Sequence, residues 1–175
     1  QRGGKHQLIE LATRNALLTL EEHTQAEENR QQRNQAILRG LQQQLELPDL
    51  PYRIEGYDIS NFQGSQSVGS LVVMENGEPC PSEYRHFRIK TVEGPNDFAS
   101  LQEVVRRRFR RGLAERAALA AGEMAEEQAR FARFPDLMII DGGKGQLQAV
   151  RQVMRELGVE KIPTFGLAEE FEHLF

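Results

Sequence analysis

The sequence has little of what disulfide-bonded, secreted or membrane-spanning proteins need. Its 175 residues include one cysteine and no tryptophan. A single cysteine excludes an internal disulfide and any multi-cysteine zinc site. No apolar run approaches the ~18 residues of a membrane-spanning helix, and no charged and then apolar leader opens the chain. These absences favour a reducing, cytoplasmic compartment. Because the chain starts at Gln1 rather than Met, we expect it to be a piece of something longer.

The chain is not basic as a whole. It has 22 Lys+Arg against 26 Asp+Glu, a formal net charge of −4. Hydrophobic residues make up 39%, and 15 glycines bring the total near the ~45–50% of globular proteins. The length predicts one domain, or one domain with an appendage. Any nucleic-acid binding must therefore come from local basic patches rather than from the overall charge.

Two segments of different character divide the chain. Residues 5–46 have leucines at helical spacing at both ends and a polar stretch between them, which predicts a long, mostly solvated linking helix. The prolines of Pro48–Pro51 end this helix. We therefore expect a helical lead-in over residues 1–47 and a second domain over residues 52–175.

The second segment changes to strand-sized pieces. Three strands are predicted at 53–60, 67–74 and 83–91, with an Asn-Gly hairpin signal after the second. A helix starting at residue 96 or 97 follows and continues in helical form through 114–134. Then come a strand at 137–140, a helix and a fifth strand at 163–168. The order β-β-β-α-β-α-β predicts an α/β fold with a mixed five-stranded sheet, in which strands one and four are central neighbours.

Two aspartates lie where a carboxylate needs a partner or a metal. Asp58 is inside the first strand, and Asp141 follows the four apolar residues of the fourth. Carboxyl ends of strands are where open α/β sheets bind ligands. If the two strands are neighbours, both carboxylates can share Mg²⁺ or Mn²⁺. The alternative is that each aspartate only caps a turn, which the Gly-Gly after Asp141 also suits.

Other charged residues have structural and functional interpretations. Asp97 can cap the helix or face the same pocket. Lys144, after two glycines at a helix start, can add a point charge near a phosphate. A run of arginines on the first domain helix forms either a solvated face or a strip that contacts DNA phosphates; its members are Arg106, Arg107, Arg108, Arg110 and Arg111. The four histidines lack metal-ligand spacing, so they are interpreted as structural.

Five motifs then appear in order, and together they are specific. They are Gly56-Tyr57-Asp58-Ile59-Ser60-Asn61-Phe62-Gln63-Gly64, Glu83-Tyr84-Arg85-His86-Phe87, Asn96-Asp97-Phe98-Ala99-Ser100-Leu101, Val105-Arg106-Arg107-Arg108-Phe109 and Ile140-Asp141-Gly142-Gly143-Lys144-Gly145-Gln146-Leu147. Over about residues 52–168 the chain closely resembles the C-terminal nuclease region of the UvrC family, the incising subunit of bacterial nucleotide excision repair.

The resemblance implies an RNase H-like fold and divalent-metal-dependent hydrolysis of DNA on the 5′ side of a lesion. By motif, Asp58 and Asp141 match the two catalytic aspartates that hold Mg²⁺ or Mn²⁺, and Asp97 matches a further acidic position. Damaged double-stranded DNA, UvrB bound to it, and UvrA are the implied partners. The family's site also uses a histidine from a later segment, which this sequence does not contain. We therefore expect the chain alone to be a weak nuclease.

Two other classes of function fit the residues without the resemblance. One is a non-catalytic nucleic-acid-binding module on the same fold, in which Asp58→Asn would leave all function intact. The other is a protein-interaction scaffold, in which the helix of residues 5–46 is the working surface and its removal would abolish partner binding.

Overall fold

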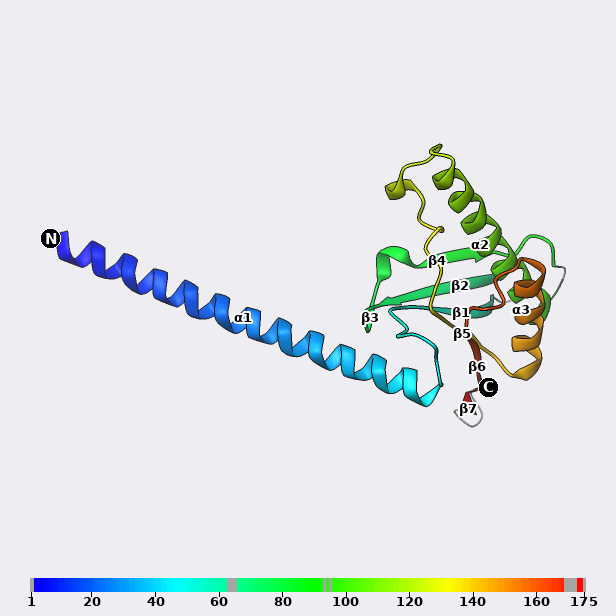
Figure 1. The fold of residues 1–175 in the computed structure, drawn as a ribbon, viewed down its shortest axis with the longest axis horizontal. Helices are drawn as coiled ribbons and strands as arrows, with labels where there is room; N and C mark the ends of the chain where they lie inside the picture. Colours follow the sequence, from blue (N-terminus) through cyan, green and yellow to red (C-terminus); the bar gives the residue numbers. More distant parts are fainter. Residues whose placement is uncertain (1, 63–65, 93, 95, 169–172, 175) are drawn as a thin grey trace.

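The computed structural model describes residues 2–62, 66–92, 94, 96–168 and 173–174. A long helix, α1 (Arg2–Gln44), projects from a sheet that carries two further helices (Figure 1). Among the described residues, none of the helices has the length and apolar character needed to cross a membrane. The structure does not describe Glu169, nor the side chains of Ala168 and His173.

The inner end of α1 is fixed to the sheet, and its outer part is not. Asn34 donates a hydrogen bond to Glu78 Oε1 at 3.0 Å, and Arg30 Nε lies 3.1 Å from the same oxygen. Leu38, one turn further on, is 2% exposed. Towards the N-terminus the large apolar side chains of Ile9 and Leu11 are more than half exposed. The predicted linking helix is therefore present, with its C-terminal third docked on the hairpin that includes Glu78.

The sheet has seven strands in the described part of the chain. Its strands run in the order β3-β2-β1-β5-β6-β7, and β4 pairs with β2. They are β1 (Arg53–Phe62), β2 (Gln66–Glu75), β3 (Glu78–Pro79), β4 (Arg85–Arg88), β5 (Leu137–Asp141), β6 (Thr164–Ala168) and β7 (His173–Leu174). The mixed α/β class and the antiparallel meander are confirmed. The two-residue strands β3 and β7 are additional to the five that were predicted.

The two central strands, β1 and β5, are neighbours, as predicted, and they run parallel. Their register pairs Ile54 with Leu137 and Tyr57 with Ile140. Helices α2 (Asp97–Ala120) and α3 (Lys144–Glu156) pack side by side on one sheet face. Helix α2 can approach β2 closely because Gly69 has no side chain. The Val104 side chain occupies the space that a Cβ on Gly69 would need. One apolar core therefore joins both helices to the central strands.

The prediction of helix through 114–134 is wrong beyond residue 120. Gly122 has φ +71°, a left-handed conformation that suits glycine, and its N–H donates to Leu119 O while Glu123 N–H donates to Ala118 O. These bonds end α2. The chain then makes turns and a short 3₁₀ helix, η2 (Glu126–Gln128). Another 3₁₀ helix, η1 (Pro81–Glu83), lies between β3 and β4. The segment after Gly122 returns across the side of α2.

Arg108 corrects the predicted arginine strip, because its side chain is 1% exposed and cannot contact DNA in this structure. Its guanidinium makes two hydrogen bonds to Glu55, Nε to Oε2 at 2.8 Å and Nη2 to Oε1 at 2.7 Å. It also donates to the carbonyls of Phe131 and Arg133. The buried residue is therefore a structural link between β1, α2 and the segment that follows α2.

Glu55, which is fully buried, completes this network. Tyr57 donates its hydroxyl to Glu55 Oε2 at 2.6 Å, and Arg53 Nε lies 3.3 Å from Oε1. Burial, together with the Glu55 charge, raises the pKa of Tyr57 well above its usual value. Burial alone would lower the pKa of Arg108, but the hydrogen bonds to Glu55 outweigh it and raise that pKa. Tyr57 stays neutral and Arg108 stays charged at neutral pH.

We predict that Arg108→Met lowers the free energy of unfolding by about 3–5 kcal/mol, because it leaves the buried Glu55 carboxylate without its cation. Arg110→Met, the same substitution at an exposed position of the same helix, should have little effect. Urea denaturation measures both. Arg108→Met/Glu55→Gln should recover part of the loss, since no unpaired charge then remains in the core. Equal stability of the two single variants would contradict the assignment.

Candidate active site

Asp58 belongs to the sheet face that α2 and α3 leave open. Along β1, Glu55 and Tyr57 are buried on the side of α2. Gly56, which lies between them, pairs with Val72 of β2, and Val72 is 44% exposed. Side chains alternate between faces along a strand, so Asp58 shares the face of Val72. It is half-buried, and Ser60 Oγ donates to its Oδ2 at 3.0 Å.

Asp141 takes the matching position on β5. Tyr57 and Ile140 pair in register and are both buried in the core, so Asp58 and Asp141 are the next residues along two parallel strands and share the open face. Neighbouring strands lie ~4.8 Å apart. Asp141 is also half-buried and is the last residue of its strand. The sheet therefore brings the two carboxylates to adjacent positions at its carboxyl end.

Strand β6 supports the turn after Asp141. Gly142 N–H donates to Leu167 O at 2.9 Å, and Gly143 N–H donates to Gln146 Oε1 at 2.8 Å. A Cβ on Gly166 would lie 2.7 Å from the Gly142 carbonyl oxygen. This close backbone contact fixes where the chain leaves β5, and with it the position of Asp141.

Asp97 lies at the same end of the molecule. The N-cap of α2 is Asn96, whose side chain accepts a hydrogen bond from Ala99 N–H at 3.1 Å, so capping does not account for Asp97. The ring of Phe98 lies so close to Gly145 that a Cβ there would be 2.7 Å from Cε1. The start of α2 therefore contacts the start of α3 at Gly145, which is four residues after Asp141.

The carboxylates form a pair rather than a larger cluster. Within the part of the chain that the structure describes, no three His, Cys, Asp or Glu side chains are grouped so that they could hold a metal ion. The structure thus brings Asp58 and Asp141 together and does not add Asp97 to a metal cluster. Two carboxylates with water and phosphate oxygens are a usual ligand set for Mg²⁺. Asp58 and Asp141 therefore fit a hard divalent cation.

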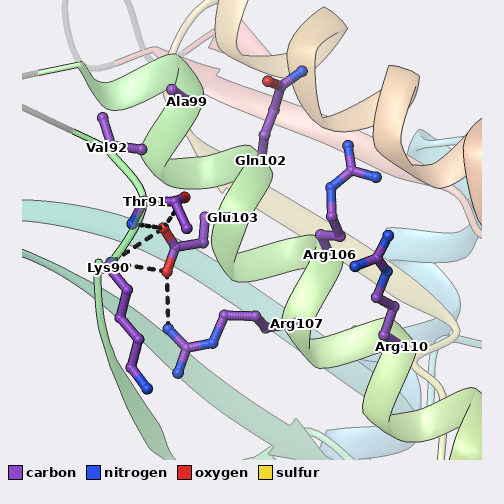
Figure 2. Close-up of a pocket in the computed structure, with 9 residues that line it drawn as sticks. All are labelled: Lys90, Thr91, Val92, Ala99, Gln102, Glu103, Arg106, Arg107 and Arg110. Carbon is purple, nitrogen blue, oxygen red and sulfur yellow. Dashed lines mark hydrogen bonds and ion pairs between the residues drawn. The ribbon is translucent and has the colours of Figure 1, made fainter.

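A groove of about 410 Å³ between α2 and the chain after β4 is lined by Arg106, Arg107 and Arg110 of the helix and by Lys90, among others (Figure 2). Arg106 Nη1 lies 2.6 Å from Glu156 Oε2, and Arg107 Nη1 donates to Glu103 Oε1 at 3.0 Å. The hydrogen bond from Arg106, with a smaller contribution from Arg110, holds the pKa of Glu156 below its usual value. The arginines are thus partly neutralised by neighbouring acids.

Glu103 connects the two sides of this groove by hydrogen bonds. Its carboxylate accepts from Lys90 N–H, Thr91 N–H and Thr91 Oγ1 as well as from Arg107, as Figure 2 shows. Burial alone would raise the pKa of Glu103, but the hydrogen bonds from Thr91, Lys90 and Arg107 outweigh it and keep the pKa low. The charged carboxylate therefore ties the backbone after β4 to α2.

Lys144 is the first residue of α3 and is exposed, three positions after Asp141. Its place at the helix start agrees with the predicted turn.

Sequence reasoning did not connect Ser70 or His86 with the open sheet face, and it interpreted His86 as structural. Ser70 pairs in register with both Asp58 and His86. The period-two alternation of β4 was the signal that could have placed His86 on the open face.

The fold is similar to endonuclease V of Ciona intestinalis in complex with a 23mer DNA, with 13% identity, a TM-score of 0.43, and coverage of 78% of this chain and 57% of that one. The sequence is 51% identical over 175 residues to UvrABC system protein C of Moorella thermoacetica, covering 100% of this chain and 27% of that protein.

A second relative, UvrABC system protein C of Symbiobacterium thermophilum, is 50% identical over 186 residues, covering 99% of this chain and 29% of that protein. The chain thus spans between a quarter and a third of the length of these curated relatives. A family model described as the UvrC RNase H endonuclease domain matches residues 42–174, which include every strand of the sheet and both central aspartates. The fold is RNase H-like, and the chain belongs to the UvrC RNase H endonuclease domain family.

Proposed function

We propose that this chain is the part of a nucleotide excision repair endonuclease that hydrolyses a DNA phosphodiester on the 5′ side of a lesion. The observation that supports this most strongly is the register of β1 and β5, which puts Asp58 and Asp141 side by side on the open sheet face. The names of the relatives and of the family support the same class of reaction.

In this proposal Asp58 and Asp141 hold Mg²⁺ or Mn²⁺ through their carboxylate oxygens. A bound divalent cation neutralises charge that develops on the phosphate and makes a water molecule more acidic. Ser60 orients Asp58 by donating to Oδ2, and the turn supported by β6 orients Asp141. Asp97 is the third catalytic residue, placed at the start of α2 to orient the attacking water by accepting a hydrogen bond from it.

The proposed substrate is damaged double-stranded DNA, and the proposed partners are UvrB on that DNA and UvrA within the same system. We assign phosphate contacts to Arg106, Arg107, Arg110 and Lys144, which all have solvent-accessible side chains. Arg108 is excluded from this set by its burial. Such contacts position the backbone without reading sequence, so the choice of lesion falls to other components.

We predict that Asp58→Asn and Asp141→Asn each weaken Mn²⁺ binding by about tenfold or more, because each removes half of the carboxylate charge at the site. Isothermal titration calorimetry measures this, and plasmid nicking with Mn²⁺ should be lost in parallel. Asp49→Asn, which removes an exposed carboxylate outside the sheet, is the matched control. Unchanged Mn²⁺ affinity in both active-site variants would remove the shared-metal proposal.

We predict that Gly166→Ala weakens both Mn²⁺ binding and nicking, because its methyl group would displace the Gly142 carbonyl and shift Asp141. The expected loss of unfolding free energy is about 1–3 kcal/mol, measured by urea denaturation. Gly143→Ala is the control, since a Cβ there meets no atom within 4 Å and the residue has φ −77°. A Gly166→Ala protein with normal metal affinity would contradict the role of this contact.

A further inference from the structure

A row of polar side chains crosses the open sheet face from Asp58 towards β4. Ser70 of β2 pairs in register with Asp58 on one side and with His86 of β4 on the other. Ser70 Oγ lies 3.4 Å from His86 Nδ1, so these two side chains point to the same face. Two strand spacings put His86 about 10 Å from Asp58 across the sheet.

Basic residues continue from this row with a period of two, through Arg88 at the end of β4 to Lys90 just after it. Phe87 and Ile89 are 8% and 6% exposed and belong to the core beneath α2, whereas His86, Arg88 and Lys90 are exposed. Ile89 N–H donates to Ser67 O at 3.1 Å, so the extended pairing with β2 continues past Arg88. We name His86, Arg88 and Lys90 the basic ladder.

The backbone of the basic ladder is held rigidly from the α2 side. Arg107 donates to Arg88 O at 2.8 Å, and the Glu103 carboxylate accepts from Lys90 N–H at 3.0 Å. Figure 2 shows the backbone of Lys90 facing Glu103, and the Lys90 side chain lines the edge of the α2 groove. Within the described residues, the Arg88 and Lys90 side chains form no ion pair with a carboxylate. Their charges are therefore available to a ligand outside the chain.

We propose that the basic ladder binds consecutive phosphates of one DNA strand as that strand leaves the Asp58–Asp141 pair. This inference rests on the proposed nuclease function and adds a binding site to it, which starts on the open sheet face at His86 and reaches the edge of the α2 groove at Lys90. Alternate residues of a strand lie about 6.6 Å apart, a distance of the order of the separation between neighbouring phosphates of one strand. Three exposed basic side chains at that spacing suit a phosphate backbone better than a compact anion.

The test is DNA affinity as a function of salt, measured by fluorescence anisotropy with a labelled duplex in EDTA, so that cleavage does not interfere. Arg88→Gln/Lys90→Gln should reduce the slope of log affinity against log salt by about 2, or about 1 for each lost phosphate contact. The control is Arg14→Gln/Arg33→Gln on α1, which makes the same change of charge at exposed positions and should leave the slope unchanged. Thermal unfolding checks that both variants are folded.

An unchanged slope in Arg88→Gln/Lys90→Gln, or an equal fall in the control, would overturn the proposal, as would a wild-type chain that does not bind the duplex. Mn²⁺ titration of the same ladder variant should give wild-type affinity. A reduced salt slope with intact Mn²⁺ binding would therefore support the role of the basic ladder in binding DNA. Failure of Asp58→Asn to alter Mn²⁺ binding would instead count against the nuclease function and leave the ladder standing as a DNA-binding site.

Discussion

The parallel pairing of β1 with β5 is the constraint on which the candidate site depends. Asp58 and Asp141 are 83 positions apart in the sequence, and only the register that pairs Tyr57 with Ile140 makes them neighbours. A shift of one residue in either strand would send one carboxylate into the core beneath α2. The chemistry proposed for this domain therefore depends on how precisely the two strands are aligned.

The buried ionic network beneath β1 helps to explain why that alignment is held. Glu55 lies between the strand and α2, and Arg108 connects it to the segment after α2 through two backbone carbonyls. Hydrophobic packing alone is tolerant of small shifts, whereas a guanidinium bonded to one buried carboxylate is not, because each lost bond leaves a desolvated polar group. The network adds specificity on the closed face, and the open face keeps its polar row for ligands.

Much of this arrangement could be predicted from local patterns. The Asn76–Gly77 reversal, with φ of 53° and 79°, and the apolar run before Asp141 each have short-range signals. Arg108 was misplaced because it stands in a run of arginines. Its spacing from Leu101 and Val105 in fact puts it in the buried stripe of the helix, but its partner Glu55 is 53 residues away and invisible to local reasoning. The end of α2 was missed because Gly122 was not recognised as the left-handed glycine that follows the C-cap residue Ala121.

The positive charges near the candidate site fall into two groups, the α2 arginines and the basic ladder. The chain is acidic overall, and the α2 arginines are partly compensated by Glu103 and Glu156. Within the described residues, Arg88 and Lys90 of the basic ladder have no such carboxylate partner.

The central claim is that two carboxylates share one divalent ion, and its most direct test is a crystal structure of the chain soaked in Mn²⁺ with anomalous scattering recorded. The account predicts one manganese peak with oxygens of both Asp58 and Asp141 at about 2.1 Å, close to the distances of a hard divalent ion. A manganese ion bound by only one of the two, or bound at other residues, would contradict it.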